Sequence, residues 1–505
     1  MVHLIQRAAD FGRAPAIVDQ AGEHTFTDLD QAARRIAASL SGTLSRGSGS
    51  RVALLIAPGF EYVATLWGIW RAGATAVPLC LSHPPPEIHF ALKDTGAELA
   101  VAGSGALELL QKGASGTHCA VLAGKDLGRS KENRRKDVST AADAMILYTS
   151  GSTGKPKGVV LSHANLEAQI KMLCSAWGWA RSDRILHTLP LHHTHGIVNA
   201  LLCSLWTGAV CEFLPCFEAA SAWHRLASSE ITLFMAVPTM YARLIAHWKG
   251  LAREEREVLG RGCAQLRLMV SGSAALPVKV FHEWKEMTGH TLLERYGMTE
   301  IGMALSNPLQ GQRRAGTVGA PLPGVEIRRI TENGAALTRD DSPGEIEVKG
   351  PAVFEQYWQR PRETGESFHD GWFRTGDVAI IEDGYWKILG RKSVDIIKTG
   401  GYKVSALEVE NVLSSHRLIQ ECAVIGVADK VWGQRVCAIV SLEQGQALEL
   451  EDLRSWSKER LAPYKVPTRL VILDSLPRNP MGKVVKPLLL EMLSDGPEAA
   501  GTRNG

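Results

Sequence analysis

Hydrophobic and polar residues follow two different patterns in the first 120 positions. Apolar residues recur at helical spacing over 26–40 and 62–71, whereas 51–56 and 74–79 are short, almost wholly apolar runs. The first pattern predicts amphipathic helices, the earlier of them opened by Thr27, and the second predicts buried strands. Strands that alternate with helices in this way indicate a parallel sheet of the α/β type.

The pattern changes at about residue 320 and again at about residue 390. Between these points, short strand-like segments are separated by Pro-Gly, Asp-Gly and Asn-Gly pairs, which are typical of turns. These segments cover residues 325–330, 345–349, 378–382 and 385–389. Beyond them, helical patterns over 405–414 and 450–460 flank a strand-like run at 422–427. We therefore predict an α/β fold: a large N-terminal domain of α/β layers with a β-rich subdomain, followed by a small α+β C-terminal domain.

Length and charge exclude some classes of function. A chain of 505 residues is too long for one compact domain, and a formal net charge of +3 gives no support for nucleic-acid binding. The longest apolar stretch, 197–206, is too short to cross a bilayer, and the first residues do not resemble a secretory signal. We expect a soluble protein, cytoplasmic if the source is bacterial and located in the mitochondrial matrix or cytosol if it is eukaryotic. The oligomeric state stays open.

The nine cysteines are scattered, with no C-x-x-C pair and no Cys/His spacing typical of a metal site. Neither a disulfide framework nor a zinc site is predicted. Those in apolar stretches are expected to be buried free thiols in a reducing compartment. They are Cys203, Cys211, Cys422 and Cys437.

A loop rich in glycine, hydroxyl groups and lysine directly follows the apolar run 144–148. Its glycines let the backbone approach a bulky anion, and its N–H groups, hydroxyls and two ammonium groups suit a triphosphate. It is not a Walker A loop, because a proline follows the first Gly-Lys pair. A flexible linker is the alternative interpretation. The predicted phosphate-binding residues are Thr149, Ser150, Gly151, Ser152, Thr153, Gly154, Lys155, Pro156 and Lys157.

This loop resembles the phosphate-binding signature of the adenylate-forming superfamily, which contains acyl-CoA synthetases, firefly luciferase and peptide-synthetase adenylation domains. The resemblance extends over nearly the whole chain, through segments 189–196, 269–277, 294–303, 372–377 and 477–483. It implies that a carboxylate attacks ATP to form an acyl-adenylate, which then passes to the thiol of coenzyme A. ATP, Mg²⁺ and coenzyme A are therefore the expected cofactors and co-substrates.

The resemblance assigns nucleotide contacts to residues in three of these segments. In ERYGMTEIGM, Tyr296 would stack on adenine, Thr299 would contact the α-phosphate and Glu300 would hold Mg²⁺, with Thr149 as a second metal ligand. An amphipathic helix start with a capping threonine is the alternative for this segment. Three further nucleotide contacts are implied: Ser273 beside adenine, and Asp377 and Arg391 on the ribose.

The resemblance also implies a mobile lid formed by residues 391–505, after an N-terminal domain of residues 1–390. In one orientation Lys483 would neutralise charge as carboxylate and phosphate combine, although by itself it could be a surface lysine. In the other orientation a different face would meet coenzyme A, using Lys398, Gly400, Gly401 and Tyr402. The hinge falls within 392–395, where the spacing departs from the family pattern.

The predicted acyl pocket contains His193, and it also contains Arg295 just before Tyr-Gly, where many relatives have a neutral residue. A guanidinium there suits bidentate capture of a second carboxylate, and a structural ion pair with Glu294 is the alternative. Segments 189–196 and 294–308 closely resemble those of the malonyl-CoA synthetases, including the mitochondrial type. This implies malonate as substrate, with Thr194 and Met303 limiting substitution at C2 and methylmalonate tolerated.

Three other functions remain open at this stage. The chain could activate other short, medium-chain or aryl acids, or it could load a separate carrier protein. A non-catalytic sensor of acyl nucleotides that kept the fold is the third alternative.

Overall fold

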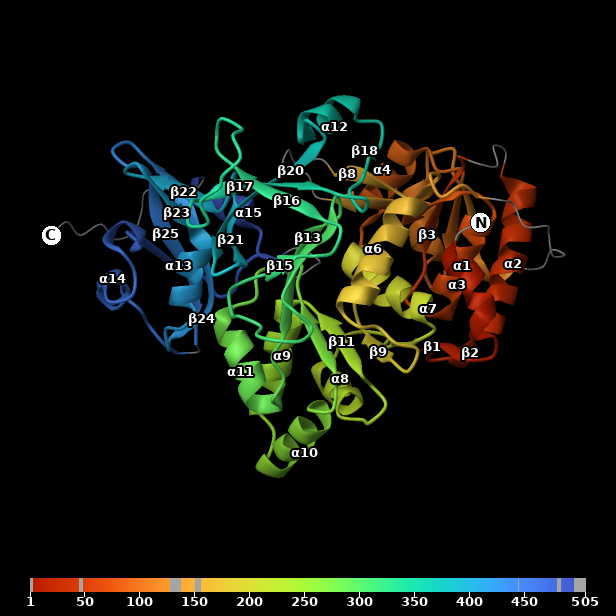
Figure 1. Cartoon of the computed structure of the whole chain (residues 1–505), viewed down its shortest axis with the longest axis horizontal. Helices are drawn as coiled ribbons and strands as arrows, with labels where there is room; N and C mark the ends of the chain where they lie inside the picture. Colours follow the sequence, from red (N-terminus) through yellow and green to blue (C-terminus); the bar gives the residue numbers. More distant parts are fainter. Residues whose placement is uncertain are drawn as a thin grey trace.

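The structure is a computed structural model that describes residues 3–44, 49–127, 138–149, 156–443, 445–478 and 483–494. Four sheets lie along the molecule, and chain position follows its long axis (Figure 1). The N-terminal helices α1 (His3–Phe11) and α2 (Phe26–Thr43) lie at one end. The C-terminal strands and helices, drawn in blue, lie at the other.

The first large sheet has nine strands, and the six in its middle run parallel. Antiparallel strands complete both edges. In spatial order the strands are β15 (Ala320–Pro321), β14 (Gly302–Ser306), β13 (Leu293–Met298), β12 (Leu268–Ser271), β11 (Leu233–Ala236), β9 (Arg184–His187), β10 (Val210–Phe213), β1 (Pro15–Asp19) and β2 (Gly22–Thr25).

The second large sheet has seven strands, five of them parallel. Its order is β18 (Gln356–Tyr357), β8 (Lys157–Ser162), β7 (Asp143–Thr149), β4 (Thr75–Pro78), β3 (Arg51–Leu55), β5 (Leu99–Ala102) and β6 (Ala120–Ala123). The predicted parallel α/β sheet is therefore present twice, with an antiparallel hairpin of β7 and β8 at the position of the phosphate loop.

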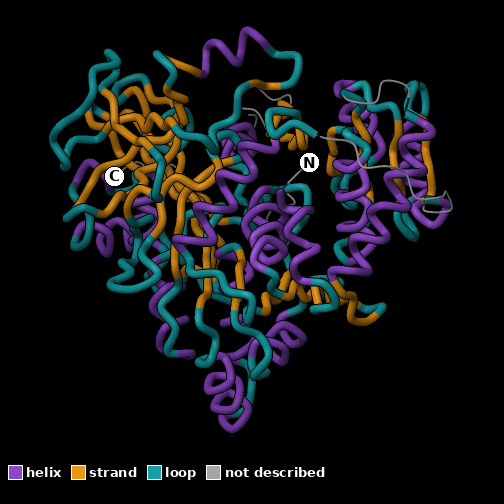
Figure 2. The backbone as a smooth tube through the Cα atoms, turned by 45° about the vertical axis from the view of Figure 1, so that its right-hand side comes forward, coloured by secondary structure: helices purple, strands orange, loops and turns teal. Residues whose placement is uncertain are grey.

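Helices cover both faces of each large sheet, so the two sheets and three helical layers stack on one another (Figure 2). Successive strand residues point to opposite faces, and this alternation divides the core. Phe234 packs with the outer helices and Met235 packs between the sheets. The layer between the sheets consists of α2, α3 (Phe60–Arg71) and α6 (His163–Ala176). The outer layers are α8 (Ala219–Leu226), α9 (Pro238–Lys249), α10 (Arg253–Cys263) and α11 (Val278–Thr288) on the nine-stranded sheet, and α4 (Pro85–Thr95) and α5 (Leu107–Ala114) on the seven-stranded sheet.

Two five-stranded sheets follow in the sequence. The first is antiparallel and forms the predicted β-rich part: β16 (Glu326–Ile330), β17 (Gly344–Lys349), β20 (Trp372–Glu382), β19 (Phe368–His369) and β21 (Tyr385–Arg391). The second comprises β23 (Tyr402–Ser405), β22 (Ile396–Thr399), β25 (Gly433–Leu442), β24 (Ile419–Asp429) and β26 (Arg469–Ile472). The remaining helical segments are η1 (Gly124–Asp126), η2 (His195–Leu202), α7 (Cys203–Thr207), α12 (Pro361–Ser367), α13 (Ala406–Leu413), α14 (Leu450–Lys458), η3 (Pro463–Lys465) and α15 (Lys486–Ser494).

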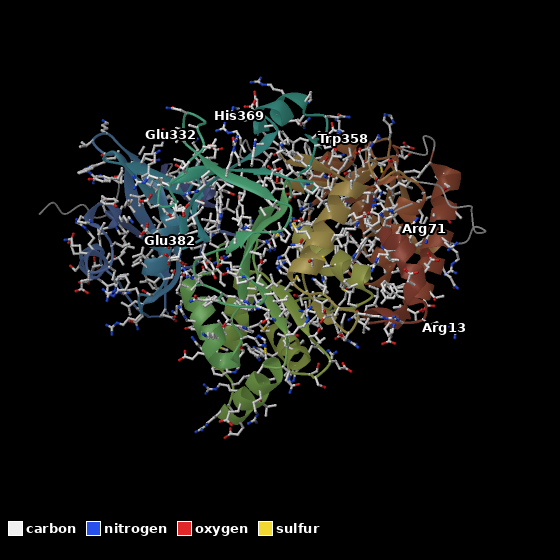
Figure 3. All side chains as sticks on the ribbon, in the orientation of Figure 1. Arg13, Arg71, Glu332, Trp358, His369 and Glu382 are labelled. Atoms are coloured by element: carbon white, nitrogen blue, oxygen red, sulfur yellow. The ribbon has the colours of Figure 1, made fainter. Side chains whose placement is uncertain are left out.

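The C-terminal sheet has a hydrophobic core of its own. Two clusters of buried residues, drawn from Ile397 to Leu489, contain no residue of the earlier sheets. Polar contacts connect this part to the β-rich sheet, including a 2.7 Å ion pair from Lys403 to Glu332. Figure 3 labels Glu332 of this pair. An exposed ion pair of this kind contributes little free energy to the interface.

Three sequence predictions need correction. The N-cap of α2 is Thr25, not Thr27: its hydroxyl accepts from the N–H of Asp28 in a capping box. Cys422 is only partly buried, although Cys203, Cys211 and Cys437 are buried as predicted, and all nine cysteines are free thiols. The helix-start interpretation of 294–303 is wrong, because β13 and β14 form a hairpin there. Among the helices in the described ranges, none is both long and apolar enough to span a bilayer.

Candidate active site

The predicted phosphate loop connects two paired, buried strands. Thr149, the last residue of β7, lies opposite Lys157, the first residue of β8. Pro156 directly precedes β8, while Ser150 to Lys155 lie outside the described residues. The Thr149 hydroxyl lies 3.5 Å from the Lys157 carbonyl oxygen. The flanking residues thus form the base of a hairpin at the end of a sheet rather than part of an extended linker.

A chain of contacts leads from this hairpin to Glu300. The ammonium group of Lys157 lies 5.1 Å from the ring centre of Tyr357. The Tyr357 hydroxyl donates a 3.0 Å hydrogen bond to Glu300. Burial raises the pKa of Glu300, which this hydrogen bond and the charge of Arg391 partly oppose. Glu300 is thus a buried carboxylate with no ion-pair partner among the described residues. Its oxygen atoms are hard ligands of the kind that Mg²⁺ binds.

Asp377 connects three parts of the fold. It lies on β20 opposite Arg391 on β21, whose guanidinium Nε donates to it over 3.1 Å. The hydroxyl of Tyr296, from β13, donates to the other carboxylate oxygen over 2.6 Å. A carboxylate has about four acceptor positions, so Asp377 retains capacity for further donors. These three residues, predicted from separate segments, therefore form one cluster.

Lys483 extends from the C-terminal part to this cluster. Burial lowers the pKa of its ammonium group, the charges of Arg295 and Arg391 lower it further, and Asp377 opposes them. The residue as a whole is exposed. The charges that act on its ammonium group thus come from β13, β20 and β21, far earlier in the chain.

Arg295 is buried on β13, with 4% of its surface exposed. Its guanidinium lies against Gly272, where a Cβ would come within 2.5 Å of Cζ, so only glycine leaves this space. The hydroxyl of Ser273 lies 3.5 Å from Nη2 of Arg295 and 3.2 Å from Nδ1 of His195. Ser273 holds this position with a φ of 72°, a backbone conformation that is costly for serine and common at functional sites.

The proposed ion pair between Arg295 and Glu294 does not form. These consecutive strand residues point to opposite faces of β13, and Glu294 instead accepts a 2.8 Å hydrogen bond from the N–H of Leu276. Burial lowers the pKa of Arg295 to about 9 and raises the pKa of Glu294 to about 8. Nε of Arg295 is buried with no hydrogen-bond partner among the described residues. A guanidinium in this state strongly favours an incoming anion.

His193 is mostly buried and contacts a second histidine of its segment. Its ring packs on that of His192, with centroids 4.0 Å apart. Burial, followed by the neighbouring charges of His192 and Lys483, lowers its pKa to about 2. His193 is therefore neutral at physiological pH and can border a polar substrate without adding charge.

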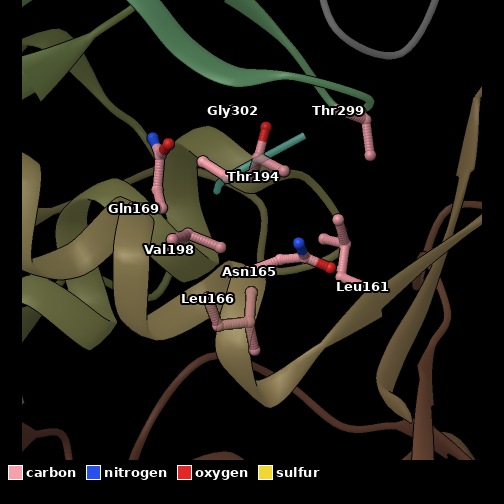
Figure 4. A pocket seen from close by; sticks show the side chains of 9 residues that line it. Leu161, Asn165, Leu166, Gln169, Thr194, Val198, Thr299 and Gly302 are labelled. Atoms are coloured by element: carbon pink, nitrogen blue, oxygen red, sulfur yellow. The ribbon is translucent and has the colours of Figure 1, made fainter. Parts of the chain in front are cut away.

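A small cavity lies beside this region, between α6 and the β13–β14 turn (Figure 4). Thr194 and Thr299 line it from opposite sides, together with Gln169 of α6. The side-chain oxygen of Gln169 accepts a 2.9 Å hydrogen bond from the N–H of Met303, which is buried in β14. Gln169 thus lines the cavity together with Thr194 and also bonds the backbone of Met303, the two residues predicted near the acyl group.

The residues predicted to meet coenzyme A lie in a different place. Gly400 and Gly401 form the turn between β22 and β23, with φ values of 54° and 83° that favour glycine. Lys398 and Tyr402 are exposed, and Tyr402 stacks on Tyr464 with ring centroids 4.2 Å apart. The ring contact of this hairpin thus lies within the C-terminal part, whereas the charge of Asp377 acts on Lys483.

Three residues of the site were not predicted from the sequence as site residues. Tyr357 and Gln169 act through other residues, Glu300 and Met303, and lie in segments without a recognised motif. His195 lies in segment 189–196 but was not predicted as a site residue, and it contacts Ser273 directly. It also begins η2, a π-helix, a rare conformation that is frequent at functional sites.

The AMP-binding enzyme family matches residues 4–358, and the C-terminal domain of AMP-binding enzymes matches residues 408–483. The chain belongs to this family of adenylate-forming enzymes, and its fold is theirs. It is 45% identical over 529 aligned positions to the mitochondrial malonate–CoA ligase ACSF3 of Xenopus laevis, covering 97% of this chain and 92% of that protein.

Two solved structures are also similar over almost their full length. ATP-bound MatB from Rhodopseudomonas palustris has a TM-score of 0.89 at 33% identity, with 98% of this chain and 99% of that chain covered. A malonyl-CoA ligase in a ternary product complex with methylmalonyl-CoA and AMP has a TM-score of 0.69 at 34% identity, with 95% and 100% covered.

Proposed function

We propose that this chain is an ATP-dependent acid:CoA ligase whose preferred substrate is malonate, with methylmalonate tolerated. The products would be malonyl-CoA, AMP and pyrophosphate. The observation that carries this proposal is the buried guanidinium of Arg295, which has no carboxylate ion-pair partner in the described part of the chain and lies near Lys483. The name of the similar frog enzyme supports the same substrate.

In the first half-reaction, one malonate carboxylate would attack the α-phosphorus of ATP and pyrophosphate would leave. Arg295 would hold the distal carboxylate in a bidentate pair, which fixes the reacting carboxylate in line. Lys483 would neutralise the charge that develops between carboxylate and phosphate. Tyr296 would stack on adenine, while Asp377 and Arg391 would bind the ribose.

Mg²⁺ fits the carboxylate and hydroxyl donors at this site. Glu300 is buried, and burial raises the pKa of its carboxyl, so a bound cation would stabilise its ionised form. Glu300 would hold the ion, with Thr149 at the base of the loop hairpin as a second ligand. When bound, Mg²⁺ neutralises charge on the phosphates, including the departing pyrophosphate. The Tyr357 hydroxyl keeps the Glu300 carboxylate oriented for this task.

In the second half-reaction, the thiolate of coenzyme A would attack the malonyl-adenylate and expel AMP. We propose that residues 391–505 rotate as a lid about a hinge within 392–395, so that Lys398, Gly400, Gly401 and Tyr402 replace Lys483 at the site. The higher TM-score against the ATP-bound structure than against the CoA-product complex, at nearly equal identity, supports an adenylation orientation here. For a eukaryotic source we propose the mitochondrial matrix or cytosol, and for a bacterial source the cytoplasm.

A turnover assay with purified protein tests the proposed function. Malonate, ATP, Mg²⁺ and coenzyme A together should give malonyl-CoA and AMP in equal amounts, and omission of coenzyme A should leave only slow pyrophosphate release. Acetate, butyrate, octanoate and benzoate serve as competing substrates in the same assay. Faster turnover of any of these acids than of malonate would overturn the substrate assignment. Absence of AMP with every acid would favour the sensor alternative.

A further inference from the structure

A cysteine and two histidines meet beside the acyl pocket, outside every residue assigned above. They are Cys80, which follows β4, His83, which precedes α4, and His192, which follows β9. One side-chain ligand atom of each lies within 4.8 Å of the other two. His83 and His192 also contact each other edge to face, with ring centroids 5.8 Å apart. Segments from both large sheets therefore converge on one point.

The sulfur atom is the centre of this cluster. Cys80 has 6% of its surface exposed. The Ser82 hydroxyl lies 3.0 Å from the same sulfur. A ring nitrogen of each histidine lies within 4.8 Å of this sulfur.

The spacing of these atoms is close to that of a metal site. In a tetrahedral zinc site, bonds of about 2.3 Å to sulfur and about 2.0 Å to nitrogen place the ligand atoms roughly 3.3–3.6 Å apart. Ligand atoms within 4.8 Å of one another reach that separation through small side-chain rotations. One thiolate and two imidazoles are borderline-soft ligands, which select Zn²⁺ over Mg²⁺. The short C-x-x-H spacing of Cys80 and His83 was missed in the sequence, because its third ligand lies more than a hundred positions away.

We propose that Cys80, His83 and His192 bind one Zn²⁺ ion per chain, with a water molecule as the fourth ligand. The ion would connect the loop after β4 of the seven-stranded sheet to the loop after β9 of the nine-stranded sheet. It would be separate from the Mg²⁺ site at Glu300 and would not need nucleotide. The ligands are close together only in the folded chain. Because the Zn²⁺ ion would bind the folded chain and not the unfolded chain, it would raise the melting temperature of the protein.

The test uses full-length protein treated with a chelator and free of nucleotide, with Co²⁺ as a spectroscopic substitute for Zn²⁺. Wild-type protein should bind one equivalent of Co²⁺ and develop a thiolate-to-metal charge-transfer band, which one equivalent of Zn²⁺ removes and excess Mg²⁺ does not. Cys80→Ser should abolish the band and weaken Zn²⁺ binding in calorimetry by roughly 100-fold. The matched control Cys216→Ser changes an exposed cysteine and should bind as wild type does.

A second variant protects the test against misfolding of Cys80→Ser. His83→Gln replaces a half-buried ligand, and it should weaken Zn²⁺ binding while its melting temperature without metal stays close to that of wild type. Zn²⁺ should raise the melting temperature of wild type and Cys216→Ser but not of His83→Gln. The proposal is overturned if wild type shows no thiolate band, or if both site variants bind Zn²⁺ as tightly as wild type. Neither outcome depends on malonate turnover, so failure here leaves the proposed enzymatic function intact.

Discussion

The ammonium group of Lys486 lies 2.5 Å from a carboxylate oxygen of Asp395. A second carboxylate, Glu410, lies 2.7 Å from the same ammonium group. Burial lowers the pKa of Lys486, but the two carboxylates outweigh it, and the net shift is upward. Lys486 begins α15, three positions after Lys483, and Asp395 lies in the proposed hinge segment. The ion pair therefore joins the segment that carries Lys483 to the segment about which the lid would rotate.

We expect Lys486→Met to destabilise the protein, because it leaves two mostly buried carboxylates without their cation. The free energy of unfolding in urea should fall by about 3 kcal/mol. Lys387→Met is the matched control: it removes an exposed pair with Glu382, 3.1 Å long, and should cost less than about 1 kcal/mol. Equal losses of unfolding free energy in the two variants would show that the ion pairs of Lys486 stabilise the protein no more than the exposed pair does.

Lys483→Ala should separate the two half-reactions. Loss of a fixed cation at the developing charge should slow malonate-dependent ATP–pyrophosphate exchange about 100- to 1,000-fold. Thioester formation from supplied malonyl-adenylate should remain near the wild-type rate, since Lys483 would be turned away in that step. Lys430→Ala, at an exposed lysine, serves as the control. An equal fall in both half-reactions would argue against the rotating lid.

Tyr357→Phe should move the pH dependence of the reaction. Glu300 must be ionised to hold a cation, and its ionised fraction rises with pH through its raised pKa. The Tyr357 hydroxyl donates to the carboxylate and lowers that pKa, so its removal should shift the acid limb of kcat/KM for MgATP to higher pH. The comparison is Tyr385→Phe, which loses a hydrogen bond to the Gln312 carbonyl oxygen. An unmoved or acid-shifted limb would contradict the assignment of Glu300.

Gly272→Ala should damage recognition of the acid without affecting the nucleotide. The new Cβ would meet the Arg295 guanidinium at 2.5 Å and force it to move. We expect kcat/KM for malonate to fall roughly tenfold while the KM for ATP stays constant. Gly42→Ala, where nothing lies within 4 Å of the added methyl group, should behave as wild type. An increase in the KM for ATP alone would show that Gly272 serves the nucleotide instead.

Local patterns in the sequence predicted the elements well where burial is continuous. The apolar run at 144–148 is β7, and the helical pattern at 62–71 lies within α3. The helix start was misplaced by two residues, since Thr25 and Thr27 are both good caps and only the tertiary fold decides between them. The alternative interpretation of 294–303 as a helix start also failed. The pairing of β13 with β14 overrides local propensity there.

The candidate site was predictable only where a residue lies in a recognisable segment. Asp377 and Tyr296 were predicted from separate segments, and no sequence pattern predicts the hydrogen bond that joins them in the structure. The burial of Arg295 and its lack of a pair with Glu294 depend on which face of β13 each side chain takes. Cys80, His83 and His192 stayed unpredicted for the same reason. Their proximity is created by loops of two sheets that are separate in the sequence pattern and meet only in the folded chain.

The most direct test of the account compares two acids of similar size on wild type and Arg295→Ala. Malonate offers a second carboxylate to the guanidinium, and propionate does not. We expect kcat/KM for malonate to fall roughly 30- to 900-fold in the variant, which corresponds to a loss of about 2–4 kcal/mol of transition-state stabilisation. Propionate should be activated as well as before or better. Equal losses for both acids, or malonate kinetics unchanged from wild type, would contradict the carboxylate clamp and the malonate assignment that rests on it.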